Sequence, residues 1–319
     1  MKYLLCALLA SLTLAAAMGA SAQQQAPARP GWAFPVKSDV QYPREDPSTV
    51  IKVAGSSKTY TAKEVDDLAN PPDWFPDEHP PMPTIVSKGQ GGDARACDSC
   101  HLPNGMGHPE SATLAGFTPT YLLNQMADLK SGDRKTGGIM DAIAKAVSDE
   151  DAKQAAAYFS SMKPFPYIKV VEATNAPKSY VIQGGMRLPV PTGGDEPLGQ
   201  RIIVLPQDPE RILARDIHGS GTIAYVPMGS LAKGKDLVTT GAGGKTFACA
   251  ICHGATLTGL GDVPRIAGLQ PIYIYRQLYS IQHGTRAGAS NALMKAPVMN
   301  LTDDDMIAIS AYVGSLPPQ

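Results

Sequence analysis

The chain has 319 residues, a formal net charge of -1 and 18% charged residues. A near-neutral chain lacks the basic excess that is typical of nucleic-acid-binding proteins, so we expect no nucleic acid as a partner. The length suits two domains with additional segments, and 31 glycines and 28 prolines predict many loops.

The first 22 residues have the pattern of an export signal. Lys2 gives a short basic start, the stretch from Tyr3 to Met18 is apolar, and Ala20-Ser21-Ala22 fits a cleavage site. We expect cleavage after Ala22 and a periplasmic mature protein, because the apolar stretch is near the lower limit for a membrane span. Cys6 then leaves with the signal peptide, and four of the 5 cysteines remain.

Residues 23–82 form a proline-rich extension that carries no motif with an evident chemistry. We expect one short helix at Ala62–Ala69, because Thr61 and Glu64 have the spacing of a capping box. Trp32 and Trp74 are the residues expected to hold this extension against the rest of the protein.

The most informative pattern is a pair of pentads, Cys97-Asp98-Ser99-Cys100-His101 and Cys249-Ala250-Ile251-Cys252-His253. C-x-x-C-H is the attachment motif of c-type haem. It predicts two covalently attached haem groups: Cys97, Cys100, Cys249 and Cys252 form the thioethers, and His101 and His253 are axial ligands of the iron. A zinc site or a redox dithiol is the rival interpretation, but either would leave the adjacent histidines unexplained.

The two halves of the chain align when one is shifted by 152 residues, which places Cys97 on Cys249. Tyr121 and Gln125 then fall on Tyr273 and Gln277. This repeat predicts two haem domains, residues 83–164 and 229–319, each built from helices around its cofactor. The first helices are expected near Pro83–Gly89 and Leu231–Gly241, the middle helices begin at prolines 119 and 271, and the last helices begin at Ser148 and Thr302, which have cap-like sequences.

Residues 165–228 are a long, loop-rich connector between the two copies. Its β-like stretches Tyr167–Val171, Arg201–Val204 and Thr222–Val226 predict short strands separated by glycine and proline. The expected fold is therefore mainly α-helical, with two haem domains in tandem and a connector that contains short β-strands.

The repeat also selects the sixth ligands of the two irons. Met140 and Met294 occupy matching positions before the last helix of each copy, and no other methionine has a methionine counterpart. Histidine and methionine together give a closed, six-coordinate iron of raised potential, which suits electron transfer. Met299 is the rival ligand in the second domain. The other histidines, 79, 108, 218 and 283, are interpreted as surface residues.

These features resemble the tandem dihaem class I cytochromes c of the cytochrome c4 type, over roughly residues 83–163 and 230–318. The resemblance implies that each ligand histidine donates its second nitrogen to a backbone carbonyl. Pro264 occupies that position in the second domain, and Ala112 in the first. It also implies that Arg134 and Arg286 approach haem propionates. The extension and the connector depart from the compact family pattern and leave the packing of the two domains open.

The predicted function is electron transfer between redox proteins such as small cytochromes, dehydrogenases or oxidases, with no catalytic residue. Two alternatives remain: a dihaem peroxidase-like enzyme, and the cytochrome subunit of a periplasmic dehydrogenase or oxidase complex, through which it would associate with a membrane. The paired methionines disfavour the peroxidase, which needs an iron with an open sixth position.

Overall fold

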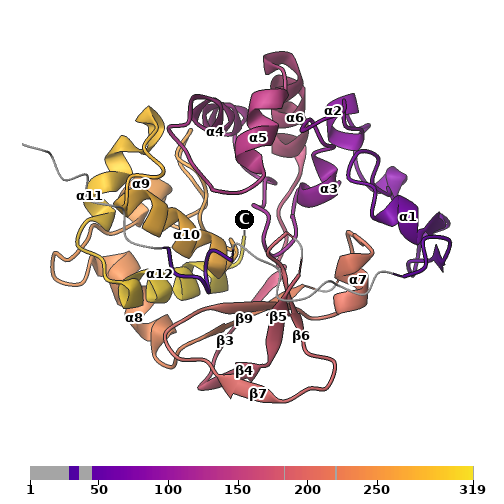
Figure 1. Cartoon of the computed structure of the whole chain (residues 1–319). Helices are drawn as coiled ribbons and strands as arrows, with labels where there is room; N and C mark the ends of the chain where they lie inside the picture. Colours follow the sequence, from indigo (N-terminus) through magenta and orange to yellow (C-terminus); the bar gives the residue numbers. More distant parts are fainter. Residues whose placement is uncertain (1–28, 36–44, 183, 220, 319) are drawn as a thin grey trace, which may run out of the picture.

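The computed structural model describes residues 29–35, 45–182, 184–219 and 221–318. Two helical bodies lie side by side, and a small β region lies below them both (Figure 1). The predicted signal peptide at 1–22 falls outside the described residues. Within the described part of the chain, no helix is long and apolar enough to cross a membrane.

The helices of the first domain surround the first C-x-x-C-H motif. They are α2 (Thr84–Ser87), α3 (Asp98–His101), α4 (Pro119–Ser131), α5 (Met140–Ala146) and α6 (Asp149–Ser161). Thr118 and Ser148 cap the two long helices, since their side chains accept hydrogen bonds from the third backbone N–H of each. Gly132, with φ of 84°, ends α4 in the left-handed conformation that glycine favours.

The second domain repeats this arrangement, but its first helix is longer than that of the first domain. Its elements are α8 (Ser230–Thr240), α9 (Ala250–His253), α10 (Pro271–Gln282), the 3-10 helix η2 (Ala289–Met294), α11 (Lys295–Val298) and α12 (Asp303–Ser315). Helices α8 and α12 cross so closely at Gly234 that an added Cβ there would lie 2.0 Å from the Ala308 carbonyl oxygen. The predicted capping box at Thr302 is present. Glycine at position 234 is therefore a packing requirement.

The connector contains the predicted strands. A three-stranded sheet pairs β3 (Ile168–Glu172) in parallel with β9 (Thr222–Val226), and β9 in antiparallel with β8 (Ile203–Pro206). Four shorter strands and one helix complete it: β4 (Asn175–Pro177), β5 (Ser179–Val181), β6 (Arg187–Pro189), β7 (Asp195–Pro197) and α7 (Pro209–Leu213). Strand β8 begins two residues after the predicted start at Arg201.

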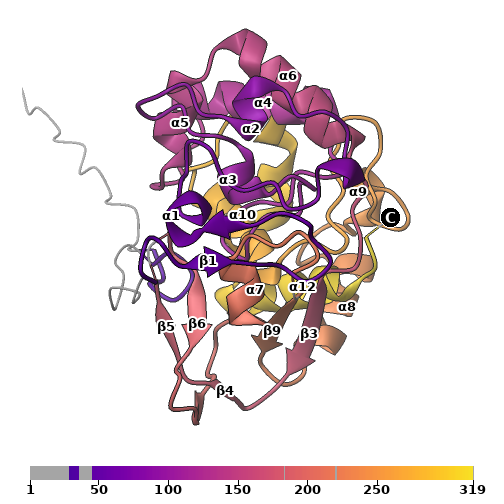
Figure 2. The ribbon, with the colours of Figure 1, turned by 90° about the vertical axis from the view of Figure 1, so that its right-hand side faces the viewer.

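Residues 45–82 of the extension fold against the first domain (Figure 2), whereas Trp32 and Ala33 contact α10 of the second. It contains β1 (Val50–Ile51), β2 (Tyr60–Thr61), α1 (Ala62–Val65) and the 3-10 helix η1 (Pro76–Glu78). The helix predicted at Ala62–Ala69 ends at Val65, because the N–H of Ala69 donates to the Asp67 side chain at 2.8 Å and the Val65 carbonyl accepts instead from Arg215. The predicted tryptophan contacts are confirmed: Trp74 is 2% exposed, and Trp32 packs on Tyr275 at 4.6 Å between ring centroids.

The two domains pack face to face, which the sequence left open. One continuous apolar core runs through both and includes Phe117 and Tyr121 of α4 together with Ile272 and Tyr275 of α10. The segments after α4 and α10 also pair directly, since the N–H of Lys135 donates to the carbonyl of Thr285 at 2.7 Å. The duplicated segments therefore form the domain interface.

Candidate functional site

The first attachment site consists of Cys97, Cys100 and His101 on the single turn of α3. The backbone N–H of His101 donates to the carbonyl of Cys97 at 3.0 Å, and the N–H of Cys97 donates to Ile85 of α2 at 3.1 Å. This turn places the two thiols and the imidazole at one end of α2. The contacts fix the motif against the first helix of the domain.

The second attachment site, Cys249, Cys252 and His253 on α9, is built in the same way. The N–H of His253 donates to the carbonyl of Cys249 at 2.9 Å, and the N–H of Cys249 donates to Val238 of α8 at 2.9 Å. Two sites far apart in the sequence therefore share one local geometry.

Both histidines bond to a backbone carbonyl through the same ring nitrogen. His101 Nδ1 lies 2.8 Å from the Ala112 oxygen, and His253 Nδ1 lies 2.7 Å from the Pro264 oxygen. Burial lowers the pKa of both imidazoles, so both are neutral near pH 7. A neutral ring that donates from Nδ1 keeps the lone pair on Nε2, the form in which histidine ligates a metal. Alanine at position 112 provides the acceptor as well as proline does.

The thiols do not have the properties of a redox dithiol. Burial raises the pKa of Cys97 to about 12 and that of Cys249 to about 11. Reactive dithiols instead have a lowered pKa, since the thiolate is the nucleophile. The first cysteine of each pair is therefore suited to a buried covalent attachment more than to thiol exchange.

The two predicted methionine ligands lie against the same apolar core as the attachment thiols. Met140 begins α5, Met294 ends η2, and both pack partly buried against the core cluster that Cys97 and Cys249 also contact. Met299 is 51% exposed. This difference in burial favours Met294 over Met299 as a ligand that faces an enclosed cofactor.

Arg134 and Arg286 meet at the domain interface. Their backbones form an antiparallel bridge, and each guanidinium donates to a glutamine of both domains: Arg134 to Gln125 at 3.0 Å and Gln277 at 3.2 Å, Arg286 to both at 2.9 Å. Arg286 also donates to the Tyr121 hydroxyl at 3.0 Å.

Two donors in this cluster have no protein acceptor. Arg286 Nε and Gln125 Nε2 are both buried without a hydrogen-bond partner among the described residues. A buried donor without a partner costs roughly 1–3 kcal/mol, so such donors point to an acceptor that the polypeptide does not supply. Carboxylates of a bound cofactor fit this requirement. The donor set as a whole, two thiol pairs, two neutral imidazoles and these orphaned donors, fits two haem groups with propionate side chains.

Comparisons with known proteins agree with this chemistry. Residues 231–317 match the family model described as Cytochrome c. The chain is 26% identical to cytochrome c4 of Azotobacter vinelandii over 249 residues, covering 72% of this chain and 89% of that protein. It is 25% identical to the thiosulfate dehydrogenase electron acceptor of Thiomonas intermedia over 228 residues, covering 70% and 80%.

The chain is a tandem dihaem cytochrome c of the cytochrome c4 type. It carries covalently bound haem c and serves as an electron carrier. Among solved structures, the chain matches cytochrome c4 of Acidithiobacillus ferrooxidans with 24% identity and a TM-score of 0.46, covering 69% of this chain and 98% of that one.

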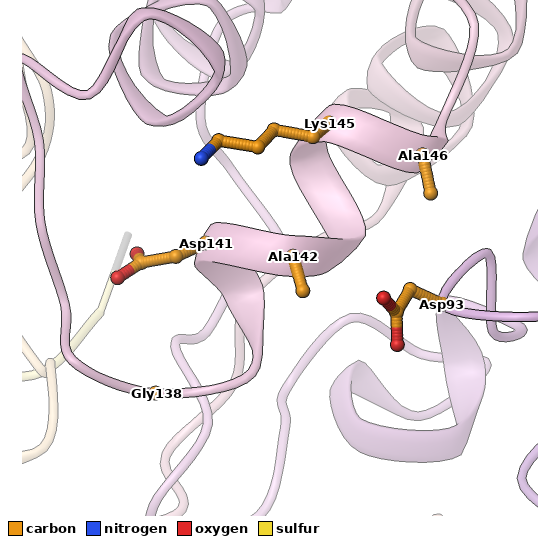
Figure 3. Close-up of a pocket in the computed structure, with 6 residues that line it drawn as sticks. All are labelled: Asp93, Gly138, Asp141, Ala142, Lys145 and Ala146. Carbon is orange, nitrogen blue, oxygen red and sulfur yellow. The ribbon is translucent and has the colours of Figure 1, made fainter.

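Each domain of the cytochrome is hollowed beside its attachment site. In the second domain a cavity of about 220 Å³ lies between α8, α9 and the end of α12, and Ala250 and Leu257 are among its lining residues. In the first domain a more open hollow of about 530 Å³ lies between Asp93 and the face of α5 that carries Ala142 and Ala146 (Figure 3). Met140 begins that same helix.

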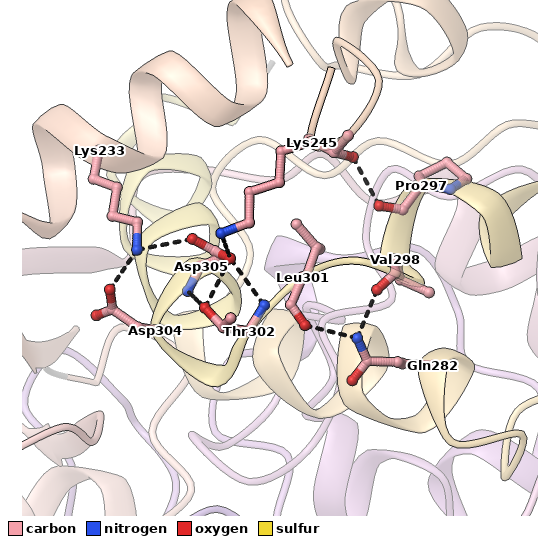
Figure 4. Close-up of polar contacts among 10 residues, drawn as sticks. Lys233, Lys245, Gln282, Pro297, Val298, Leu301, Thr302, Asp304 and Asp305 are labelled. Atoms are coloured by element: carbon pink, nitrogen blue, oxygen red, sulfur yellow. Dashed lines mark hydrogen bonds and ion pairs between the residues drawn. The ribbon is translucent and has the colours of Figure 1, made fainter. Parts of the chain in front are cut away.

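A polar network fixes the methionine segment of the second domain (Figure 4). The Asp305 carboxylate, fully buried, pairs with Lys233 at 2.8 Å and with Lys245, which precedes the second attachment site. Burial alone would raise the pKa of Asp305, but the bonds from these two lysines outweigh it and hold that pKa well below its usual range. Gln282 Nε2 donates to the carbonyls of Val298 and Leu301 at 2.6 and 2.8 Å. These bonds join the two segments that enclose the second site.

The cytochrome has a feature at its first site that the sequence did not reveal. Residues 45–82 and 209–218, which we call the cap, cover α3 from outside. Trp74 Nε1 donates to the Ala214 carbonyl at 2.7 Å, and Arg215 donates to the carbonyls of Val65, at 2.8 Å, and Ser99. Asp98 is 2% exposed, and burial raises the pKa of its carboxyl to about 8, although Arg215 opposes the shift.

The surface interpretation of the remaining histidines is wrong for two of them. The side chain of His79 is 4% exposed and lies 3.1 Å from Asp73. His108 has a buried Nδ1, and burial lowers the pKa of its ring to about 3. His79 belongs to the cap itself, and His108 Nε2 lies 3.4 Å from Arg215 of the cap. No local sequence pattern indicated that the cap is present. His218 remains half exposed beside Glu78, as expected.

Proposed function

We propose that this protein is a periplasmic electron carrier with two six-coordinate histidine–methionine sites. The observation that carries the proposal is the repeated bond from histidine Nδ1 to a backbone carbonyl, at Ala112 and at Pro264. It leaves Nε2 of His101 and of His253 available at the end of each C-x-x-C-H turn.

When bound, each haem supplies an iron that alternates between the ferrous and ferric states. Cys97 and Cys100, and likewise Cys249 and Cys252, would hold the two groups through thioether bonds. His101 and Met140 would be the axial ligands of the first iron, and His253 and Met294 those of the second. These ligand pairs leave no open coordination position, which suits a carrier and not an enzyme.

Arg134 and Arg286 would bind the propionates at the domain interface. A guanidinium forms two parallel hydrogen bonds to a carboxylate, and Arg286 Nε and Gln125 Nε2 are buried donors without a protein acceptor. Both arginines contact the opposite domain, so one cluster would serve both cofactors. The domains would span residues 83–164 and 229–319, with 23–82 as extension and 165–228 as connector.

The electron donor that we propose is a periplasmic dehydrogenase. The relatives from Thiomonas intermedia and Stutzerimonas stutzeri are both named as electron acceptors of thiosulfate dehydrogenase, with 25% and 26% identity. The signal-like sequence of residues 1–22 supports export to the compartment in which such an enzyme would be met.

The visible spectrum of the oxidised protein tests this function. We expect a methionine–iron charge-transfer band in the far red with the amplitude of two sites. A high-spin band, or rapid turnover of peroxide by the half-reduced protein, would contradict the carrier and favour the peroxidase-like enzyme.

A further inference from the structure

The two attachment sites differ sharply in exposure. The residue before the second cysteine is Ser99 in the first site, which is 1% exposed, and Ile251 in the second, which is 68% exposed. Cys252 is itself exposed, whereas Cys100 is partly covered. Because each thiol is the point at which a cofactor edge is attached, the second edge faces solvent more openly than the first.

The cap accounts for this difference. Its apolar residues Val65, Trp74 and Phe75 form one buried cluster with Leu102, the residue that follows the first attachment site. Arg215 reaches through the cap to the carbonyl of Ser99, between the two cysteines. Figure 1 shows α1 on the outer side of α3. At α9, by contrast, Ile251 and Cys252 are exposed. The cap therefore lies between a partner protein and the haem edge that would be attached at the first site.

The second site is bordered by exposed apolar side chains. Phe247 precedes it and is 58% exposed, Ile251 lies within it, and Leu260 follows it and is 63% exposed. The N–H of Gly259 donates to the carbonyl of His253 at 2.9 Å, which turns the following loop back and places Leu260 beside the motif. Exposed apolar side chains grouped in this way are typical of interaction sites.

This part of the chain is also uncharged. From Thr246 to Gly261 the sequence contains no Asp, Glu, Lys or Arg. The lysine just before it, Lys245, is paired with the buried Asp305. A charged contact face on the partner would be desolvated at this surface without gaining an opposite charge. An apolar, uncharged face would avoid that desolvation cost.

We propose that Phe247, Ile251 and Leu260 form the docking surface at which a redox protein with an uncharged, apolar contact face exchanges electrons, and that the cap excludes such a partner from the first site. The inference rests on the proposed function and adds a direction to it. Electrons enter and leave the protein through the second domain. The first domain exchanges electrons with the partner only by way of the second.

The test compares Ile251→Glu with two matched controls in the full mature protein. Met228→Glu places the same charge at a connector position that is 63% exposed, and Ile139→Glu places it beside Met140 of the first domain, at 42% exposure. The probe is a small blue-copper protein of near-zero net charge, and stopped-flow absorbance gives the second-order rate of electron exchange. We expect Ile251→Glu to lower that rate by about tenfold, and both controls to stay within about twofold.

A second measurement reads binding without electron transfer. With the probe in its redox-inert, zinc-substituted form, hydrogen exchange should slow in peptides that cover residues 247–260 and stay unchanged in peptides that cover 97–105. The proposed docking surface is excluded if Ile139→Glu slows electron exchange and Ile251→Glu does not. It is also excluded if the probe protects residues 97–105 from hydrogen exchange. It is also excluded if sedimentation shows that Ile251→Glu separates a dimer of this chain, because the surface would then be a self-interface. A failure of the wild-type protein to exchange electrons with any probe would contradict the proposed function itself.

Discussion

The two domains hold their histidines alike and are stabilised differently. In both, Nδ1 of the ligand histidine lies within 2.8 Å of a backbone carbonyl. In the second domain, the last helix is anchored by the buried Asp305 and its two lysines. In the first, the equivalent Asp151 is only partly buried and receives one long-range hydrogen bond, from Gln90 at 3.1 Å. Where the second domain has an internal ionic network, the first has the cap.

This contrast shows which part of a duplicated domain is free to change. The path of the backbone determines the ligand geometry, because the acceptor of each histidine is a main-chain oxygen at Ala112 or Pro264. The support around it comes from side chains and added segments. One copy can therefore acquire a cover while the other stays open, with the same chemistry at both irons.

Removal of one thiol pair is the most severe way to break the comparison. We expect Cys97→Ser with Cys100→Ser, and separately Cys249→Ser with Cys252→Ser, to remove one covalently bound haem each and spare the other. Intact-mass analysis after acid-acetone extraction measures the number retained. Cys6→Ser is the control, because Cys6 lies in the predicted signal peptide. Loss of both haems from either double variant would mean that the two sites do not mature independently.

Neutralising the equivalent carboxylates of Asp305 and Asp151 should lower the stability of the two domains by different amounts. Asp305→Asn is expected to lower the free energy of unfolding of the second domain by about 2 kcal/mol, less than for a fully enclosed pair because Lys233 and Lys245 are partly hydrated. Asp151→Asn should have a much smaller effect, since its carboxylate is only partly buried and accepts from the uncharged side chains of Gln90 and Ser148. Urea titrations followed by haem absorbance give both values, and equal effects would contradict the contrast.

The stability that the Asp305 carboxylate contributes should depend on pH. The pKa of Asp305 is lowered in the folded protein, so its ionic network contributes fully above the unfolded value of about 4. That contribution is lost as the pH falls through the lower folded value. The difference in stability between wild type and Asp305→Asn should therefore be constant near neutral pH and shrink below about pH 4. A difference that persists at the lowest pH would exclude the ionic explanation.

Exchange of the proposed methionine ligands, Met140 and Met294, tests the comparison at the two irons. Met140→His and Met294→His should each lower one of the two reduction potentials, on the order of 0.1 V, because histidine favours the ferric state more than methionine does. Met299→His serves as the control and should leave both potentials unchanged, since Met299 is half exposed. A redox titration measures all three. Should Met299→His lower a potential while Met294→His does not, Met299 is the ligand.

The smallest expected effect is that of salt. If the uncharged stretch from Thr246 to Gly261 is where a partner docks, the rate of exchange with a near-neutral protein should change little with ionic strength. Stopped-flow rates at low and high salt measure this. A steep monotonic dependence would indicate that charged residues elsewhere guide the encounter.

The sequence predicted the repeated parts of the fold and little of what joins them. The caps at Ser148 and Thr302 have local signatures, and the helices that they begin are present. Strand β3 was found from its composition, but its parallel pairing with β9 brings together residues more than fifty positions apart, which no local pattern specifies. The cap was missed for the same reason: Trp74 and Ala214 are 140 residues apart.

At the site, the residue types alone were enough to predict the two C-x-x-C-H motifs. The structure added the contacts that depend on how distant segments pack together. Ala112 gives no chemical signal in the sequence, because only its main-chain oxygen is used. The cap-like sequence that begins at Thr302 was recognised, but it gave no sign that Asp305 pairs with two lysines, which come from α8 and from the following loop. The two arginines were matched by the repeat, yet their meeting across the interface depends on how the domains pack.

The cap has a consequence for how the chain matures. Residues 209–218 are synthesised more than a hundred residues after Cys97, and once folded they bury the backbone between the first two thiols. We expect the first haem to be joined before this segment closes, whereas the second site stays accessible in the finished fold. A fragment that ends near residue 164 would lack residues 209–218 of the cap, so we expect the first repeat to be less stable alone than in the full chain.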